Sequence, residues 1–172
     1  TGLQTIERNA QQQIQLINDL LDISRMIRGQ LSLDLQIVDP AIPILHALET
    51  VQFAVEAKNM QIDVSLDETV GPIRADAGRL QQVMWNLLSN AIKFTPPEGQ
   101  VTVRLTSVAD AVQTQVSDTG RGIDAAFLPQ VFTLFKQQDS SMTRSFGGLG
   151  LGLAIAKQVV EGFITGLHKS PF

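Results

Sequence analysis

Apolar residues recur along the first thirty positions at alternating intervals of three and four, which is the spacing of a coiled-coil seam. The seam consists of Leu3, Ile6, Ala10, Gln13, Ile17, Leu20, Ser24 and Ile27, in which Gln13 and Ser24 are polar interruptions. Ile14, Leu21 and Ile23 widen the apolar face beyond a two-stranded seam, which favours a four-helix bundle. The pattern predicts one long helix that pairs with a second copy, although a helix packed on its own domain is the alternative.

Beyond Gly29 the hydrophobic period switches repeatedly between two residues and 3.6 residues. Alternation predicts strands at 31–37, 61–66, 73–75, 101–105 and 112–116. Helical spacing predicts helices at 39–58, 78–94, 125–135 and 149–160, with Asp39 and Asp76 as N-caps of the first two. Residues 162–172 show no strand-like alternation, so the predicted sheet is left with an unprotected edge. The order predicts an α+β fold, a two-layer α/β sandwich with helices on one face of a mixed sheet, preceded by the long coiled-coil-like helix.

Composition narrows the possible classes of protein. The 172 residues suffice for one domain with a core and a short appendage. A net charge of −4 without a basic tract argues against nucleic acid as a partner. The absence of cysteine excludes disulfides, thiolate metal sites and cysteine nucleophiles. No apolar run approaches the ~20 residues of a membrane helix, so we expect no membrane segment in this chain.

Three polar residues of the predicted helix 78–94 share one face. Asn86, Asn90 and Lys93 lie at positions i, i+4 and i+7. Amide oxygens suit Mg²⁺, and a lysine reaches phosphate as a point charge. Phe94 adds an apolar surface for a purine or a ribose. Taken alone, Asn90 is more simply a satisfied polar residue at a helix edge.

A second motif, Asp118-Thr-Gly120-Arg-Gly122, ends the last predicted strand. We expect the Asp118 carboxylate to be buried there, where it needs a strong hydrogen bond. The exocyclic amine of adenine is such a donor, and guanine lacks an amine at that position. The alternative is an aspartate that caps a turn.

A third motif is a glycine-rich loop that leads into the last predicted helix. Its glycines are Gly147, Gly148, Gly150 and Gly152. Exposed N–H groups and the helix dipole at such a terminus favour phosphate. The loop is neither a Walker loop nor a Rossmann fingerprint, and a flexible hinge is the alternative. Lys136 and Arg144 either close over the phosphates or stay in solvent. Three such motifs in this order predict a site for nucleotide and metal.

These motifs resemble the N box and the two glycine boxes of the GHKL ATP-binding fold, in particular those of sensor histidine kinases of two-component systems. Residues 132–135 (FTLF) resemble the F box that lies between the glycine boxes. Residues 16–25 (LINDLLDISR) resemble the second helix of the kinase dimerisation hairpin, and residues 79–86 (RLQQVMWN) resemble the approach to the N box. The resemblance covers about residues 1–160.

The resemblance implies two parts of the chain and a set of site residues. Residues 1–29 would be the second helix of the dimerisation and phosphoacceptor hairpin, and residues 30–172 the ATP-binding catalytic domain, with C-terminal strands truncated or divergent. It implies ATP and Mg²⁺ as cofactors, with Asn90 and Asn86 at the metal. It also implies nucleotide contacts by Lys93, Phe94, Asp118, Gly120, Gly122, Arg144, Gly148, Gly150 and Gly152.

Position 86 separates the branches of this superfamily. Gyrase, mismatch-repair and heat-shock-chaperone ATPases carry a glutamate there, four residues before the metal asparagine, and it activates water. An amide such as Asn86 is no general base at neutral pH, which favours a kinase over an ATPase. The phosphoacceptor histidine of these kinases would precede Thr1, and His46 and His168 match no such motif. We therefore expect no catalytic residue within the chain and no autophosphorylation of the isolated chain.

The sequence thus predicts the ATP-binding catalytic part of a sensor histidine kinase in a two-component phosphorelay. It would transfer the γ-phosphoryl group of ATP, with Mg²⁺, to a histidine outside this chain. The alternatives are a degenerate, non-catalytic dimerisation module and a serine-directed kinase of the anti-sigma-factor type. The implied partners are a second copy, through residues 1–28, and a response regulator or receiver domain. The implied location is the cytoplasm, free or as the cytoplasmic portion of a membrane-bound sensor.

Overall fold

The computed structural model describes residues 2–138 and 149–168. The helices are α1 (Gly2–Ile27), α2 (Ala41–Ala57), α3 (Ala77–Phe94) and α5 (Gly152–His168), with a short 3₁₀ helix η1 (Leu128–Gln130). The strands are β1 (Gln36–Val38), β2 (Gln61–Leu66), β3 (Ile73–Ala75), β4 (Gln100–Val108) and β5 (Ala111–Asp118). In the described part of the chain, no helix combines the length and the apolar character that crossing a membrane requires.

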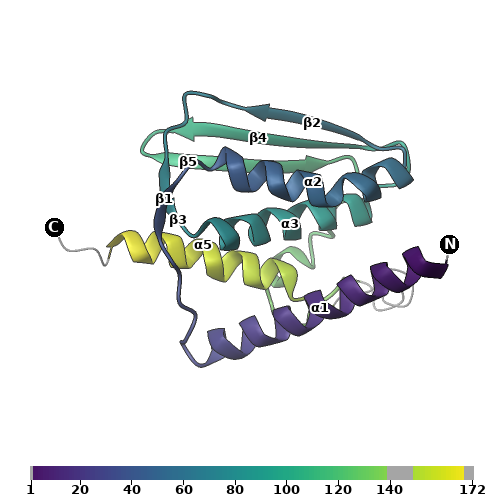
Figure 1. The fold of residues 1–172 in the computed structure, drawn as a ribbon, viewed down its shortest axis with the longest axis horizontal. Coiled ribbons are helices and arrows are strands. Elements are labelled where there is room, and N and C mark those ends of the chain that lie inside the picture. The colour runs from purple at the N-terminus through teal and green to yellow at the C-terminus, as the bar shows by residue number, and fades with distance from the viewer. Residues whose placement is uncertain (1, 139–148, 169–172) are drawn as a thin grey trace.

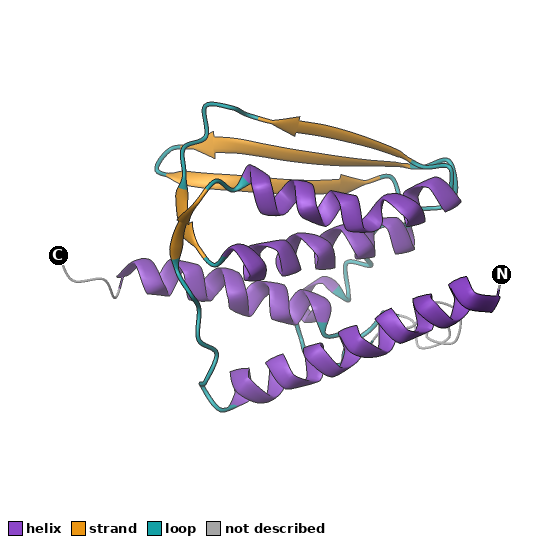
Figure 2. Cartoon of the chain, in the orientation of Figure 1, coloured by secondary structure: helices purple, strands orange, loops and turns teal. Residues whose placement is uncertain are grey.

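The main sheet has the strand order β2-β4-β5, in which β2 runs parallel and β5 antiparallel to β4. Helices α2 and α3 cover one face of this sheet (Figures 1 and 2). Val101, Val103 and Leu105 alternate along β4 with more exposed residues and pack into the core that contains Ile44 and Leu88. The predicted two-layer α+β sandwich is confirmed. Strands β1 and β3 form a separate antiparallel pair.

A second apolar cluster joins α1, α3 and α5. Its buried members include Ile23 of α1, Val83 of α3 and Ile155 of α5. The linker after α1 passes close to α5, because a Cβ on Gly162 would lie 2.7 Å from Leu33 Cδ1. The long first helix therefore does not stand alone but rests with one side on the sandwich (Figure 1).

Of the two predicted helix caps, one is confirmed. Asp76 Oδ1 accepts a hydrogen bond from the Arg79 amide at 3.0 Å and caps α3, as predicted. For α2 the expected cap is wrong by one position, since the N-cap residue is Pro40. Asp39 Oδ1 nevertheless accepts from the Ala41 amide at 2.9 Å.

Three predicted elements differ from the structure. The strand at 31–37 is reduced to β1, and the helix at 125–135 is wrong apart from η1. Pro129 cannot donate a helical hydrogen bond, and Phe135 has a φ of 61°, so this stretch cannot continue as an α-helix. Conversely α5 runs on to His168, because Phe163 packs one turn beyond Val159 in the same cluster. The predicted end of this helix at residue 160 is therefore wrong, and residues 169–172 lie outside the described chain.

Candidate nucleotide-binding site

Helix α3 carries the first group of predicted site residues on one face. Asn86 is buried, with 3% of its surface exposed, whereas Asn90, Lys93 and Phe94 are half-buried. The other side of the helix, with Met84, Leu88 and Ile92, is buried in the core. Burial of that side fixes the rotation of α3 and so fixes the direction of the polar face.

The first glycine loop meets the end of α3. Asp118 is the last residue of β5, and its Oδ1 accepts a hydrogen bond from the Gly120 amide at 2.8 Å. The Thr95 hydroxyl, on a residue that is 1% exposed, donates to the same oxygen at 3.5 Å. A Cβ on Gly120 would lie 2.7 Å from the Phe94 carbonyl oxygen. Only glycine permits this approach of the loop backbone to α3.

The Asp118 side chain is exposed, so the expectation of a buried carboxylate is wrong. The end of β5 lies open, and there the carboxylate keeps its hydration and avoids the free-energy cost of burial. An exposed carboxylate at this place remains accessible to a hydrogen-bond donor on a ligand.

Positive charge gathers at Phe94. Lys93 Nζ lies 5.0 Å and Arg121 Cζ lies 5.1 Å from the centroid of the Phe94 ring, within the range of cation–π contacts. Burial, and secondarily the charge of Arg121, lower the pKa of Lys93 from its ordinary value. An anionic ligand at this place would relieve the repulsion between the two cations. Gly122 follows Arg121 with a φ of +71°, in the left-handed region that favours glycine.

The second glycine loop meets the middle of α3. Helix α5 begins at Gly152, whose carbonyl accepts a hydrogen bond from Asn86 Nδ2 at 3.1 Å. A Cβ on Gly152 would lie 3.1 Å from Asn86 Oδ1. At Gly150 φ is +69° and a Cβ would lie 2.7 Å from the Lys136 carbonyl oxygen. The Asn86 amide therefore bonds to the N-terminus of α5, a contact that the sequence did not predict.

The two loops thus approach one helix at two points. The contacts at Asn86 and Phe94 are eight residues apart, which corresponds to about 12 Å along an α-helix. Asn90 lies halfway between them on the same face. These residues suit a nucleotide with its metal, because the amide of Asn90 lies along α3 between the N-terminus of α5 and the exposed carboxylate of Asp118. The close approach of the loop backbone at Gly120 leaves no room for a Cβ. Arg144, Gly147 and Gly148 lie outside the described residues.

Some structural roles could not be read from the sequence. Thr95 follows the predicted helix and holds Asp118, but threonine after a helix has no special signal. The residues that resemble the F box differ in burial. Phe132 and Phe135 are exposed, whereas Leu134 packs against the second apolar cluster. His46 is exposed on α2, away from the glycine loops in the chain.

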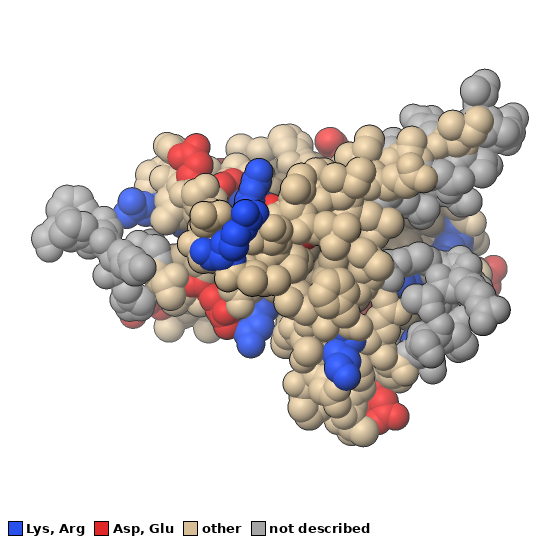
Figure 3. Space-filling view, turned by 90° about the horizontal axis from the view of Figure 1, so that it is seen from below, with Lys and Arg blue, Asp and Glu red and all other residues tan. Residues whose placement is uncertain are grey.

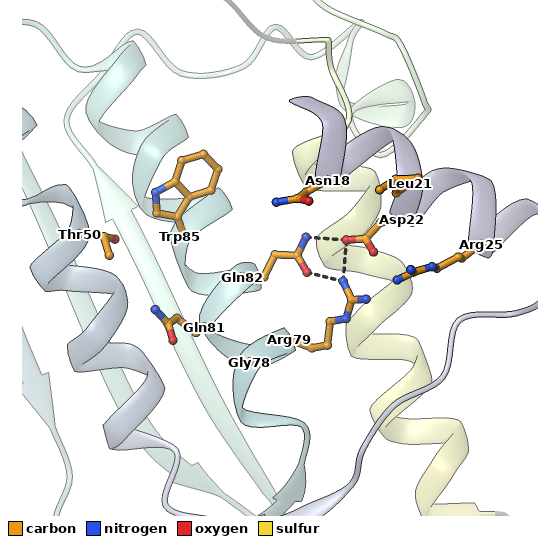
Figure 4. A pocket seen from close by; sticks show the side chains of 10 residues that line it. All are labelled: Asn18, Leu21, Asp22, Arg25, Thr50, Gly78, Arg79, Gln81, Gln82 and Trp85. Atoms are coloured by element: carbon orange, nitrogen blue, oxygen red, sulfur yellow. Dashed lines mark hydrogen bonds and ion pairs between the residues drawn. The ribbon is translucent and has the colours of Figure 1, made fainter. Parts of the chain in front are cut away.

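A separate cavity of about 530 Å³ lies between α1, α2 and α3 (Figure 4). In it, Asp22 accepts hydrogen bonds from Arg79 Nη1 at 2.6 Å and from Gln82 Nε2 at 2.8 Å. Asn90 and Asp118 do not line this cavity. It belongs to the junction between α1 and the sandwich rather than to the glycine loops.

Comparisons with known proteins identify the family of the chain. Residues 75–167 match the sequence model of the histidine kinase-, DNA gyrase B- and HSP90-like ATPases. The match covers more than half of the chain, and the chain belongs to this family.

Individual relatives point to one branch of the family. The hybrid signal transduction histidine kinase D of Dictyostelium discoideum is 38% identical over 98% of this chain and 13% of its own length. The circadian input-output histidine kinase CikA of Synechococcus elongatus is 39% identical over 92% of this chain and 21% of its own. The crystal structure of full-length ShkA in complex with AMPPNP superposes with a TM-score of 0.76 at 29% identity, over 91% of this chain and 32% of ShkA. The chain therefore spans only a minor part of these relatives.

Proposed function

We propose that this chain is the ATP-binding catalytic part of a sensor histidine kinase. It takes part in transfer of the γ-phosphoryl group of ATP, with Mg²⁺, to a histidine supplied outside this chain. The observation that carries the proposal is the contact of both glycine loops with α3, at Asn86 and at Phe94, with Asn90 between them. The names of the relatives support the same branch.

Each site residue then has a distinct part in binding. Asp118 accepts a hydrogen bond from the adenine amine, while Phe94 and the Gly120 and Gly122 backbone border the base. The Asn90 amide oxygen and, beside it, Asn86 serve the metal, which neutralises charge on the phosphates when bound. Lys93 and the N-terminus of α5, with Gly150 and Gly152, attract the phosphates. For Arg144 and Gly148, which lie outside the described residues, we propose contacts with the nucleotide.

The amide at position 86 directs the outcome of the reaction. Asn86 cannot accept a proton from water at neutral pH, so hydrolysis lacks a general base. The γ-phosphoryl group then persists until a histidine nitrogen forms the new P–N bond and ADP leaves. In the proposed relay the phosphoryl group moves on to a response regulator or receiver domain, and the use of ATP places this part of the protein in the cytoplasm.

We further propose that α1 pairs with a second copy through residues 1–28. Six apolar side chains of α1 are at least 47% exposed, namely Ile6, Ile14, Ile17, Leu20, Leu21 and Ile27. Figure 3, which views the molecule from the side of α1, shows a broad surface without charge. A buried four-helix arrangement would remove this apolar surface from water.

Titration of the 172-residue chain with MgATP tests the binding site. We expect Asn90→Ala and Asp118→Ala to weaken binding at least about tenfold, since each removes a polar contact worth ~1–3 kcal/mol. Asp110→Asn, in the turn between β4 and β5, is the matched control and leaves the affinity unchanged. A folded chain that binds no nucleotide would instead support the non-catalytic dimerisation module.

Incubation with γ-labelled ATP tests the chemistry. The isolated chain should stay unlabelled, and a longer version of the protein that includes the first hairpin helix should carry acid-labile label on histidine. Label on His46 or His168 would contradict the proposal. Acid-stable label on a serine substrate would favour the kinase of the anti-sigma-factor type.

A further inference from the structure

The ammonium group of Lys58 binds the end of α3. Its Nζ donates to the carbonyl oxygens of Ile92 at 2.6 Å, Lys93 at 3.2 Å and Thr95 at 2.9 Å. The last carbonyl groups of a helix lack partners within the helix and carry its negative dipole end. A half-buried cation that contacts three of these carbonyls fixes both the position and the charge of this helix end.

Lys58 reaches this place because α2 and α3 run side by side and end on the same side of the molecule (Figure 1). It is the C-cap residue of α2. Its own carbonyl oxygen accepts a hydrogen bond from the Glu98 amide at 3.0 Å. Lys58 thereby holds the chain on both sides of Pro96 and Pro97, from the helix end through the turn into β4.

The segment that Lys58 fixes is the one on which the first glycine loop rests. The Phe94 carbonyl oxygen limits the approach of Gly120, and the Thr95 hydroxyl donates to Asp118. From the turn into β4, the Gln100 amide donates to Thr119 Oγ1 at 2.9 Å and the Thr119 amide to the Gln100 carbonyl at 3.0 Å. Both routes lead from Lys58 to the residues beside Asp118.

We propose that Lys58 is a positioning residue for the base end of the nucleotide site. By holding the backbone of residues 92–98, it sets where Phe94, Thr95 and the first glycine loop present the Asp118 carboxylate. It does not bear on the phosphate end, where α5 contacts α3 two turns earlier, at Asn86. The inference rests on the proposed nucleotide function and adds to it a residue outside the N box and both glycine boxes.

The test compares two ligands on Lys58→Met, which keeps an unbranched side chain, one atom shorter, and removes its donor. We expect the Kd for MgATP to rise about tenfold, which equals ~1.4 kcal/mol and lies near the lower bound of a hydrogen bond to a charged group. The Kd for magnesium tripolyphosphate, which has no base, should change less than about twofold. Lys58→Arg, which retains the charge and the donors, should restore most of the affinity for MgATP.

Arg104→Met is the matched control, since it removes a cation from an exposed position of β4. Circular dichroism at the titration temperature shows that each variant is folded, and Lys58→Leu, which also lacks a donor, replaces Lys58→Met if the latter does not fold. Unchanged MgATP affinity in a folded variant, or equal loss for both ligands, would overturn the Lys58 proposal alone. A wild-type chain that binds neither ligand would overturn the proposed function and this inference with it.

Discussion

Gly120 shows how closely one residue limits the site. An added Cβ would lie 2.6 Å from Asp118 Oδ1 and 2.7 Å from the Phe94 carbonyl oxygen, and the second atom belongs to the backbone. We expect Gly120→Ala to push the loop from α3, to destabilise the fold by ~1–3 kcal/mol and to weaken MgATP binding about tenfold. Thermal unfolding and nucleotide titration measure the two effects.

Gly71 provides the control for this substitution. A Cβ on Gly71 would meet no atom within 4 Å, and its φ does not lie in the left-handed region. Gly71→Ala should therefore leave both stability and affinity unchanged within about 0.5 kcal/mol. Wild-type affinity in Gly120→Ala would show that the loop moves away from α3 without harm to the site.

Lys93 gives the site a pH dependence. Burial, and secondarily Arg121, hold the pKa of Lys93 below its ordinary value of 10.5. Because the folded pKa is lower than the unfolded one, the penalty for the charged form is fully present below the folded pKa. It disappears as the pH rises toward 10.5, so the contribution of Lys93 to stability increases with pH across that window.

The variant Arg121→Gln separates the two causes of the lowered pKa of Lys93, namely burial and the charge of Arg121. We expect the pKa of Lys93 to rise in this variant but to stay below 10.5, because burial is the larger cause. The chemical shift of the Lys93 ε-methylene group, followed by NMR against pH, measures the change. Arg104→Gln is the control, and a pKa that is the same in wild type and Arg121→Gln would contradict the effect of Arg121.

The site residues were predictable to the extent that each motif is local. Asn86, Asn90 and Lys93 share a face because helical spacing alone places them there. The Asn86 contact with Gly152 joins positions 66 residues apart, and the Lys58 contacts join positions 34 to 37 residues apart. No spacing rule reports such pairs, since only the packing of α3 between α2 and α5 brings them together.

At the scale of elements, one ion pair joins α1 to α3. Asp22, which is 5% exposed, contacts Arg79 Nη1 and Gln82 Nε2, and Figure 4 shows both partners directed toward it. We expect Asp22→Asn to weaken the docking of α1 and to lower the free energy of unfolding by about 2 kcal/mol, the range for a hydrogen bond to a charged group.

Trp85 reports this change, because it lines the same cavity and is the single tryptophan of the chain. Urea unfolding followed by its fluorescence gives the free energy, and the emission of the folded state responds to wetting of the junction. Asp110→Asn removes an exposed carboxylate as the control. Equal unfolding curves for Asp22→Asn and wild type would show that the Asp22 pairing does not hold α1 on the sandwich.

Helices and strands were predicted correctly where one face of the element is buried, because burial imposes a periodic hydrophobic pattern. The prediction failed in the loop at 125–135, whose only regular element is the short η1. Strands β2, β4 and β5 alternate because one face meets α2 and α3. The stretch 125–135 has apolar residues at helical spacing, yet Pro129 and the positive φ of Phe135 prevent a helix. The last turns of α5 were not predicted because the glycines in this stretch disfavour a helix. The packing of Val159 and Phe163 in the second cluster nevertheless stabilises the helix there.

At the scale of the whole molecule, one side of α1 packs on the sandwich and the other side is exposed. Asp22 and Ile23 face the sandwich, whereas Ile17 is 58% exposed and belongs to the predicted seam. We expect Ile17→Glu to weaken self-association at least about tenfold, since it removes an apolar side chain worth ~1.5–3 kcal/mol on burial. Sedimentation velocity over a concentration series measures the dimer constant.

Phe53→Glu makes the same chemical change on α2, where Phe53 is 73% exposed. It should leave the dimer constant and MgATP binding as they are. Association lost equally in both variants would indicate that residues outside α1 form the contact. The spacing of the seam predicted this exposed apolar surface, but only the fold shows that Asp22 and Ile23 of α1 contact the sandwich.

The cavity between α1 and α3 has a consequence for motion. About 530 Å³ of space beside a buried carboxylate far exceeds what one water molecule needs, and its polar lining offers water several partners. Water in such a space would hydrate the polar side chains of the junction. We therefore expect movement of α1 relative to the sandwich to require loss of the Asp22 hydrogen bonds and of the apolar packing around Ile23 and Met26.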